Sequence, residues 1–589
     1  MRSVKSIVLC LVATLLCLSS AMAEDAAVSI FFDADAISIS SDSAAVHIDG
    51  TTVTISDEGV FRLSGVLENG QIIVDAGKKD DVTLILDGVT ITNQTAPALL
   101  IENANLTILQ LAADTENTFI SGTPADVLTT SADASATGGA IHAKDSLRIE
   151  GTGALMIGGY LNNGLHTSNH LTIRSGKITV EAVNHGVKGK DSVLVEGGAL
   201  TITSGKDGVV SDDTTGEHFG VVTVRDGSLS IISNGDGIQA ETQLTVSGGT
   251  LDITAGGGSA DVTYDAPDDW GGWRGGFGPG SDFGETNDDT ISTKGLKSGG
   301  IISISGGVIT VDAADDTIHA NGSITISGGT MTLSSGDDAI HADQELTVED
   351  GIINVLASYE GMEANQILIA GGVIDIVSAD DGLNAYGGQS MGGRGGFGGG
   401  RGGFGGRGGF GGFGGMGDQN AAQNSPKAED MPNLHITGGK IHINAEGDGL
   451  DSNGNIIVDG GEIIVDGPSR GGNGAIDAGT ENGGACVISG GLVLAIGTSG
   501  MAESFDSSSS QCSFHVTMQG VSAGDEIVIT ASDGTELYRY TAAKSCASIV
   551  FSSPDLVIGE TYTVTAGDRT TQITQSSVST GGQSMRPWR

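Results

Sequence analysis

The sequence is poor in several kinds of residue, and each shortage excludes a class of protein. Aromatic residues make up only 4% of the 589 residues, so a core must be built from aliphatic side chains. The 27 Lys and Arg residues are far outnumbered by 73 Asp and Glu residues, and the net charge of −46 repels nucleic acid and anionic membranes. This charge would also repel an acidic polysaccharide, unless cations lie between the two.

A long apolar run is also missing, except near the start of the chain. Residues 7–18 are apolar apart from Thr14, follow Arg2 and Lys5, and precede the small-x-small pattern Ala21-Met22-Ala23. This stretch is too short to span a bilayer comfortably. We therefore predict a signal peptide at 1–23, no membrane span after its cleavage, and an extracellular or cell-surface location. A retained N-terminal anchor is the alternative.

The five cysteines are too few for a disulfide framework, and two of them lie in the predicted signal peptide. Cys486, Cys512 and Cys546 remain in the mature chain. One disulfide can form among them, with Cys486–Cys512 as a first guess.

A repeat of about 22 residues dominates the rest of the sequence. The string SITISGGTMTL at 323–333 is followed by DDAIHA at 337–342, and one unit earlier IISISGGVITV at 301–311 is followed by DDTIHA at 315–320. Each unit is typical of strand, Gly-Gly turn, strand, acidic turn and short strand, with apolar residues alternating with Ser and Thr. Such a unit buries its apolar face only when neighbouring units stack on it.

We therefore predict an all-β fold, a right-handed parallel β-helix of about 22-residue coils with a small C-terminal β module or cap. The expected order is irregular coils at 24–120, regular β-helix at 121–500, β module at 501–568 and disordered tail at 569–589. Gly-rich inserts interrupt the coils at 256–285 and 387–431. Trp270 and Trp273 in the first insert could stack on sugar rings or anchor their loop. The Arg and Phe residues of the second resemble a nucleic-acid-binding tract, but an exported acidic protein argues against that partner.

The second position of the acidic turn can be followed through the repeat. It is occupied in order by Gly139, Asn163, His185, Asp207, Asp236, Asp289, Asp316, Asp338, Glu360, Asp381, Asp448 and Gly474. In-register stacking would place successive carboxylates about 5 Å apart, where like charges destabilise each other. Protonation or bridging cations would relieve this repulsion.

Calcium suits such a ladder because it accepts several oxygen ligands in flexible geometry. We predict Ca²⁺ ligands among Asp207, Asp236, Asp288, Asp289, Asp315, Asp316, Asp337, Asp338, Glu360, Asp381 and Asp448. The alternative is that Asp merely favours a tight Asp-Gly turn. That alternative covers Asp207 and Asp236, where Gly follows, better than Asp316 and Asp338, where Thr and Ala follow.

Basic side chains accompany the same turns. Lys188, Lys190, Lys294 and Lys297 could pair with glycan carboxylates, or could be ordinary outward-facing lysines. His142, His166, His319 and His341 share one repeat position, where an exposed row of side chains is expected. A His–His metal pair at 319 and 341 is the alternative.

Several of these coils resemble a known family. The motifs are KDG at 206–208, GDGIQA at 235–240, KGLK at 294–297, DDAIHA at 337–342 and YEGMEA at 359–364, with SPDL at 553–556 and GETY at 559–562 near the end. They resemble the bacterial carbohydrate-binding β-helix family, defined on a clostridial surface protein that binds cellulose and polygalacturonic acid. The resemblance runs from about residue 30 to about residue 568. It implies a pectate-lyase-like right-handed helix, bound calcium, and acidic or cellulosic glycans as ligands, but no proven catalysis. The Gly-rich inserts depart from the family pattern, so the ligand can differ.

Three functions remain open from the sequence. The favoured one is a non-catalytic protein that binds polygalacturonate-like or cellulose-like polysaccharide through calcium. The second is a calcium-dependent polysaccharide lyase, with Lys190 or Lys294 as the base beside a calcium-neutralised uronate. The third is a structural or adhesive surface protein.

Overall fold

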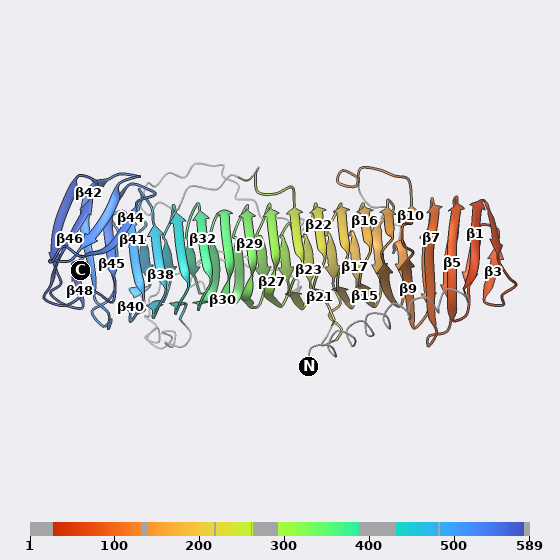
Figure 1. Cartoon of the computed structure of the whole chain (residues 1–589), viewed down its shortest axis with the longest axis horizontal. Coiled ribbons are helices and arrows are strands. Elements are labelled where there is room, and N and C mark those ends of the chain that lie inside the picture. Colours follow the sequence, from red (N-terminus) through yellow and green to blue (C-terminus); the bar gives the residue numbers. More distant parts are fainter. Residues whose placement is uncertain are drawn as a thin grey trace, which may run out of the picture.

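In the computed structural model, the chain forms a long rod of stacked strands that ends in a separate strand module (Figure 1). The structure describes residues 27–130, 138–216, 219–260, 262, 292–387, 431–480 and 483–581. The first strands and the C-terminal module lie at opposite ends of the rod. No helix in these ranges is both long enough and apolar enough to cross a membrane. The predicted signal peptide, and most of both predicted inserts, lie outside the described residues.

The strands follow one another along the rod in chain order. The first coils contain β1 (Val28–Ala34), β2 (Ala36–Ile39), β3 (Val46–Asp49), β4 (Thr52–Ile55), β5 (Gly59–Leu67), β6 (Gln71–Asp75), β7 (Asp81–Asn93), β8 (Leu99–Asn103), β9 (Leu106–Leu111) and β10 (Glu116–Ser121). The next coils contain β11 (Gly139–Ala143), β12 (Ser146–Gly151), β13 (Ala154–Gly159), β14 (Asn163–Thr167), β15 (His170–Ile173), β16 (Lys177–Ala182), β17 (Val187–Gly189), β18 (Ser192–Val195), β19 (Ala199–Ser204), β20 (Val209–Ser211), β21 (Val221–Val224), β22 (Ser228–Ser233), β23 (Ile238–Ala240), β24 (Gln243–Val246) and β25 (Thr250–Ala255). The later coils contain β26 (Leu296–Ser298), β27 (Ile301–Ala313), β28 (Ile318–Ala320), β29 (Ile324–Ser335), β30 (Ile340–Ala357), β31 (Met362–Ile369), β32 (Val373–Ser378), β33 (Leu383–Ala385), β34 (Asn433–Ile436), β35 (Lys440–Ala445), β36 (Leu450–Ser452), β37 (Asn455–Val458), β38 (Glu462–Asp466), β39 (Ile476–Ala478), β40 (Cys486–Ile488) and β41 (Leu492–Gly497). The module adds β42 (Ser513–Val521), β43 (Glu526–Thr530), β44 (Glu536–Thr541), β45 (Cys546–Ser552), β46 (Thr561–Ala566), β47 (Arg569–Thr574) and β48 (Ser579–Gly581).

Parallel pairing between successive coils defines the architecture. β28 pairs in parallel with β30, with Ile318 opposite Ile340. β29 pairs in parallel with the rest of β30, with Ile324 opposite Leu346 and Met331 opposite Ile353. Each segment therefore lies beside the same segment of the next repeat. This arrangement confirms the predicted parallel β-helix.

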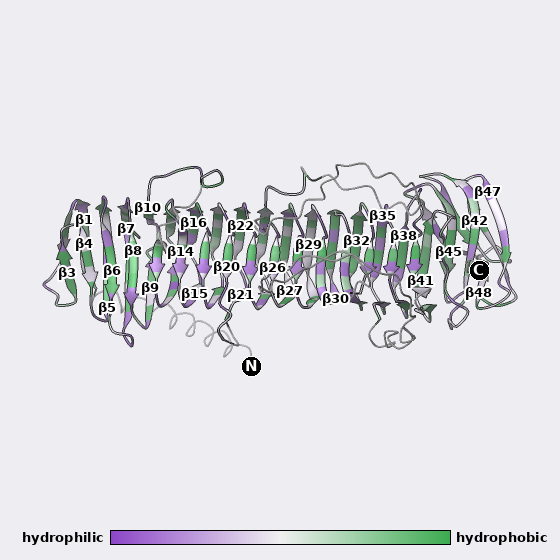
Figure 2. Cartoon of the chain, turned by 180° about the vertical axis from the view of Figure 1, so that it is seen from behind, coloured by the Kyte–Doolittle hydropathy of each residue, from purple (hydrophilic) through white to green (hydrophobic). Residues whose placement is uncertain are grey.

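Buried aliphatic side chains form one core along the rod. Within each segment they alternate with polar residues, as in β22, where Leu229 and Ile231 are buried and Ser228 is exposed. Figure 2 shows the resulting alternation of hydrophobic and hydrophilic bands. Full burial of such a side chain contributes roughly 1.5–3 kcal/mol. The coils are therefore held together by stacked aliphatic side chains, as the shortage of aromatic residues predicts.

The Gly-Gly pairs turn the chain between two segments of a coil. The second glycine has positive φ, 97° at both Gly307 and Gly329, where a side chain is strained. A Cβ at Gly328 would lie 2.8 Å from the carbonyl oxygen of Ser305 in the preceding coil. The pair therefore provides both the turn and the close stacking of turns.

Antiparallel strands cover both ends of the helix. At the N-terminal end, β2 pairs with β1 and β3 with β4, both antiparallel. At the other end, β45 pairs antiparallel with β41, the last helical strand. These strands occupy edges that would otherwise present unpaired backbone groups.

The C-terminal module has its own sheet, in the order β44-β43-β46-β47, and its own core around Phe514, Phe551 and Tyr562. The predicted module is thus confirmed, but the disorder predicted from residue 569 is wrong as far as Gly581. β47 pairs with β46 across a tight turn at Gly567, and β48 pairs with β42. The sequence did not reveal β47 as a strand because it is rich in Thr and Gln and its outer face is exposed.

The three described cysteines are free thiols, so the guessed Cys486–Cys512 disulfide is wrong. Cys486 is buried in the core of the rod, while Cys512 and Cys546 belong to the core of the module. Cys486 and Cys512 therefore lie in different cores, which explains why these two do not pair.

Candidate functional site

Two parallel columns of side chains run along one edge of the rod, one residue of each from every coil. The turn column lies just before the short strand of each coil and consists of Asn163, His185, Asp207, Asp236, Lys294, Asp316, Asp338, Glu360, Asp381 and Asp448. The strand column lies three residues later and consists of His166, Lys188, Val210, Gln239, Lys297, His319, His341, Glu363, Asn384, Asp451 and Asp477. The sequence repeat therefore does stack carboxylates in register.

One member of the predicted ladder is corrected. Ile238 pairs with Leu296 and Leu296 with Ile318, so Lys294 holds the position that was assigned to Asp289. Asp288 and Asp289 themselves lie outside the described residues. The string DDTI at 288–291 imitates the repeat, but Leu296 is the residue that fills the buried core position.

The first carboxylate oxygen of the turn column serves the fold. Asp236 N–H donates to Asp207 Oδ1 at 2.9 Å, Lys294 N–H donates to Asp236 Oδ1 at 2.8 Å, and Asp338 N–H donates to Asp316 Oδ1 at 3.1 Å. The same bond joins Asp448 N–H to Asp381 Oδ1 at 2.6 Å. Each carboxylate thus satisfies a backbone donor of the next coil.

The glycine after many of these aspartates is needed for packing between coils. A Cβ at Gly237 would lie 2.3 Å from Ile253 Cγ2 and 2.6 Å from the Gly295 carbonyl oxygen. Positive φ is not what selects glycine here, since Gly237 is not among the positive-φ glycines. The alternative of a tight Asp-Gly turn is therefore replaced by contact with the next coil.

In one part of the turn column, which we term the paired segment, Lys or His side chains occupy the second carboxylate oxygen. The segment consists of Asp207, Asp236, Asp316 and Asp338, all buried. Asp207 Oδ2 lies 3.0 Å from His185 Nδ1, and Asp236 Oδ2 lies 3.1 Å from Lys297 Nζ. Asp316 Oδ2 lies 2.7 Å from both Lys294 Nζ and His319 Nδ1. Asp338 Oδ2 lies 2.9 Å from His341 Nδ1. Burial alone would raise the pKa of Asp316, but His319 and Lys294 lower it to about 2.

The C-terminal part, which we term the acid segment, lacks such partners. It consists of Glu360, Asp381 and Asp448 of the turn column with Asp451 of the strand column, and none of the four makes an ion pair within the described ranges. Burial and neighbouring carboxylates raise the pKa of Asp381 to about 7 and that of Asp448 to about 8. The same causes raise the pKa of Asp451 well above its usual value.

Two residues of the acid segment, together with the neighbouring Asp477, offer oxygen atoms close enough to share one cation. Carboxylate oxygens of Asp448, Asp451 and Asp477 lie within 4.8 Å of one another. Asn384, in register with Asp451, is buried, and its Oδ1 has no hydrogen-bond partner in the described structure. Carboxylate and amide oxygens are the ligands that calcium prefers.

Three of the four predicted glycan-binding lysines are engaged inside the protein. Lys188 Nζ lies 2.5 Å from Asp212 Oδ2, while Lys294 and Lys297 pair with turn-column carboxylates. Lys294 also lies 2.8 Å from Asp315 Oδ2. Lys190 alone has a side chain about half exposed, at 48%, although it lies 3.5 Å from Asp213.

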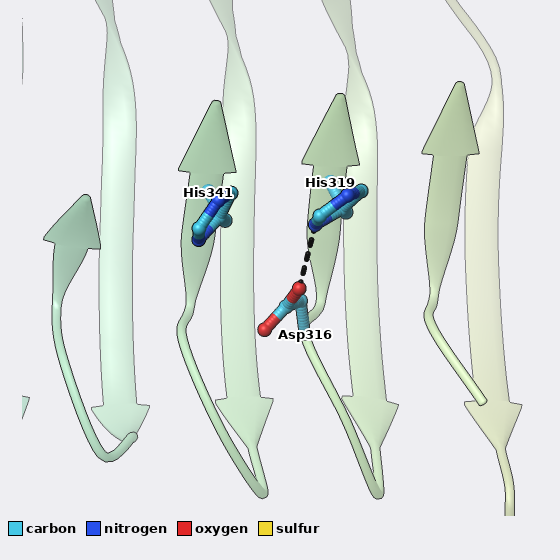
Figure 3. A group of neighbouring side chains, drawn as sticks. All are labelled: Asp316, His319 and His341. Atoms are coloured by element: carbon cyan, nitrogen blue, oxygen red, sulfur yellow. Dashed lines mark hydrogen bonds and ion pairs between the residues drawn. The ribbon is translucent and has the colours of Figure 1, made fainter. Parts of the chain in front are cut away.

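The histidines of the strand column are not the exposed row that was expected. Only 15% of the His319 side chain and 17% of the His341 side chain are exposed, and their rings stack at 4.9 Å (Figure 3). Burial alone would lower the pKa of His341, but hydrogen bonds to Asp338 and Glu363 raise it to about 11. At the other end of the column, burial and nearby His142 lower the pKa of His166 to about 3.

Sequence reasoning missed four members of the strand column, Glu363, Asn384, Asp451 and Asp477. The signal was present, because each follows its turn-column residue by three positions, as the recognised histidines do. It was overlooked because the residue type changes from His to Glu, Asn and Asp along the column. Asp337, predicted as a ligand, lies in a group with Asp315 and Asp316 that Lys294 already neutralises.

Comparison with known proteins relates much of the chain to carbohydrate-binding proteins. The sequence model of the carbohydrate-binding domain-containing proteins matches residues 49–339. A carbohydrate-binding domain-containing protein of Acetivibrio thermocellus is 32% identical over 169 residues, which are 27% of this chain and 54% of the relative, or about half its length. A solved structure, described as the polysaccharide lyase-like protein from C. thermocellum in a gadolinium derivative, is 31% identical and has a TM-score of 0.37, with 39% of this chain and 92% of that chain covered. The family match includes the paired segment and ends before Glu360, so the acid segment lies beyond it.

Proposed function

We propose that this protein, whose residues 49–339 match the carbohydrate-binding domain-containing family, binds polysaccharide along the edge formed by the two columns. Calcium held by the acid segment would bridge the protein to an acidic glycan. The predicted signal peptide would bring the protein to the cell surface or the extracellular space, where such polysaccharides occur.

The observation that carries the proposal is the acid segment itself. Asp448 is buried, Asp381 and Asp451 are half-buried, and none of the three has a cationic partner among the described side chains. Carboxylates stacked at this spacing repel one another unless protonated or bridged. A calcium ion would remove this repulsion and would take its further ligands from the Asn384 amide oxygen, water and a uronate.

The spacing of the coils suits a linear glycan. Successive coils lie about 4.8 Å apart, which is comparable with the length of one sugar unit along an extended chain. Tyr386 is half-buried beside the columns, with its ring 6.1 Å from that of His341, and offers an apolar face to a sugar ring. At the other end, Lys190 is the predicted lysine whose exposure allows a contact with a glycan carboxylate.

The geometry favours binding over the lyase alternative. A lyase base must be able to lose its proton beside the bound uronate. Burial alone would lower the pKa of Lys294, but Asp316 and Asp315 raise it, so this lysine stays protonated. Within the described residues, no Lys or Arg pairs with Asp381, Asp448 or Asp451.

The test is retention of the mature chain by polygalacturonate and by cellulose, in calcium or in a chelator. Calcium should retain the wild-type protein on polygalacturonate, and the chelator should release it. Asp451→Asn should weaken retention about tenfold or more because one charged ligand is lost. The ultraviolet absorbance of an unsaturated product, followed in the same samples, should stay flat.

Asp459→Asn is the matched control, because Asp459 is half-exposed and pairs with His435 at 2.8 Å away from the two columns. Its retention should equal that of the wild type. Retention that survives the chelator would exclude the calcium bridge. Failure to bind any uronate or cellulose would support the structural alternative, and sustained product would identify a lyase.

A further inference from the structure

Two carboxylates from neighbouring coils meet around one imidazole nitrogen beside the paired segment. His341 Nδ1 lies 2.9 Å from Asp338 Oδ2 and 3.0 Å from Glu363 Oε2. Asp338 lies in the turn before β30, His341 lies in β30, and Glu363 lies opposite His341 in β31. All three ligand atoms lie within 4.8 Å of one another.

These separations suit a small transition-metal ion. Tetrahedral zinc, with bonds of about 2.0–2.1 Å to nitrogen and oxygen, holds its ligand atoms about 3.3 Å apart. Opening of the cluster by a few tenths of an ångström would therefore admit the ion. The ion would replace the proton that His341 Nδ1 now donates to the two carboxylates.

The second nitrogen of His341 is already oriented for such a role. His341 Nε2 lies 3.2 Å from Asp343 Oδ1. Histidines that bind metals usually donate their other ring N–H to a carboxylate or carbonyl, and this bond leaves the remaining nitrogen free for the ion. Asp343 thus holds the His341 ring in the way that a metal-binding histidine is held.

A further donor pair lies one coil earlier. His319 stacks on His341, and its Nδ1 lies 2.7 Å from Asp316 Oδ2 (Figure 3). The stacked rings keep the two histidines side by side, but Lys294 Nζ already occupies Asp316 Oδ2 at 2.7 Å. The ammonium group competes with a metal ion for Asp316, so Asp316 and His319 form the weaker candidate site. No lysine reaches Asp338 or Glu363 in the described structure.

We propose that Asp338, His341 and Glu363 bind a divalent transition-metal ion of the zinc class, in a site separate from the calcium proposed for the acid segment. The imidazole sets the selectivity, because calcium prefers oxygen ligands while zinc, copper and nickel bind imidazole well. Asp343 is a positioning residue that orients the His341 ring. The site needs no glycan and no calcium.

The test measures Zn²⁺ binding to the mature chain by equilibrium dialysis with calcium in large excess and glycan absent. The wild type should hold Zn²⁺ under these conditions, and Co²⁺ in its place should give the visible absorption of a low-symmetry nitrogen and oxygen site. His341→Gln and Glu363→Gln should each weaken Zn²⁺ binding about tenfold or more and remove the Co²⁺ absorption. Asp343→Asn should weaken binding about 10- to 100-fold with the three ligands intact.

His435→Gln is the control, because His435 pairs with Asp459 in another strand and should leave Zn²⁺ binding unchanged. Circular dichroism verifies that each variant is folded. If His341→Gln does not fold, Glu363→Gln provides the test in its place. Displacement of Zn²⁺ by calcium, or unchanged affinity in folded His341→Gln or Glu363→Gln, would overturn the proposal. Loss of binding in His319→Gln alone would also overturn it by moving the ion to the neighbouring pair. Because glycan is absent and calcium is saturating, none of these outcomes depends on the proposed polysaccharide binding.

Discussion

The paired segment and the acid segment have the same backbone and the same position in the coil, but they neutralise charge differently. In both, one carboxylate oxygen accepts an N–H from the next coil, as at Asp207 and Asp381. In the paired segment, Lys294, Lys297 or a histidine covers the other oxygen. In the acid segment, no protein cation does so within the described ranges.

Within a single side chain, one carboxylate oxygen therefore stabilises the fold, and the other determines which cation is bound. The oxygen that accepts a backbone N–H serves the fold at Asp207, Asp236, Asp316, Asp381 and Asp448. The second oxygen is free to vary in its partner. The acid segment is therefore the part of the ladder where an external cation has most to contribute.

The largest expected effect comes from making the paired segment resemble the acid segment. Lys294→Met removes the ammonium that lies between Asp315 and Asp316, and it should cost about 3–5 kcal/mol because it breaks a buried ion pair and leaves His319 as the one cationic partner of Asp316 in the described structure. Urea denaturation checks it. Lys440→Met, which breaks the exposed pair with Glu462 at 3.6 Å, should cost about 0–1 kcal/mol. Equal losses in the two variants would contradict the role given to Lys294.

The next effect is a dependence on pH that arises in the acid segment. Folding raises the pKa of Asp381 to about 7 and that of Asp448 to about 8, so the folded state binds more protons than the unfolded state above about pH 4. Stability without calcium should thus be highest near pH 4–5 and fall by several kcal/mol as the pH rises toward 8, because a difference of one pKa unit between the folded and unfolded states corresponds to about 1.4 kcal/mol. Urea midpoints across this range measure the fall. Asp448→Asn should flatten it, and a rise in stability with pH would be the wrong sign.

Calcium should reverse that loss at high pH. An ion that binds only the folded state at 100 times its dissociation constant stabilises by about 2.7 kcal/mol. The melting temperature at pH 8 should therefore rise with calcium, and it should rise much less in Asp451→Asn. Lys294→Met, outside the acid segment, should keep the calcium response. An unchanged wild-type melting curve would remove calcium from this segment.

The smallest effect tests the division of labour between the two oxygens. Asp207→Asn keeps an oxygen that can accept the Asp236 N–H and should cost less than about 1 kcal/mol. Asp207→Ala leaves that buried N–H without a partner and should cost about 1–3 kcal/mol. The two variants are compared by urea denaturation. If both variants cost the same, the hydrogen bond to the next coil is not what Asp207 contributes.

The sequence predicted the features that depend on periodicity. The coil, the stacking of Asp316 on Asp338 and the core follow from apolar alternation and from the 22-residue step between these two residues. The place of Lys294 in the turn column was missed because an insert precedes it and carries a false copy of the repeat at 288–291. β47 was missed because its polar strand is stabilised by pairing with β46 and by little burial.

The partners of the carboxylates could not be predicted, because they depend on which side chain of a neighbouring coil reaches which oxygen. Lys188 and Lys297 have the same repeat position, yet Lys188 reaches Asp212 outside the turn column, while Lys297 reaches Asp236 within it. Spacing alone gives the column but not the choice of partner. This is also why His319 and His341 were expected to be exposed.

The antiparallel strands that cover both ends of the rod have a consequence for its size. Because β2 and β3 at one end and β45 at the other pair with the outermost coil strands, the number of coils in one chain sets the length of the described rod. Duplication or loss of one whole repeat would change that length by about 4.8 Å and leave the interior pattern intact. The length of the rod can thus change only in steps of one coil.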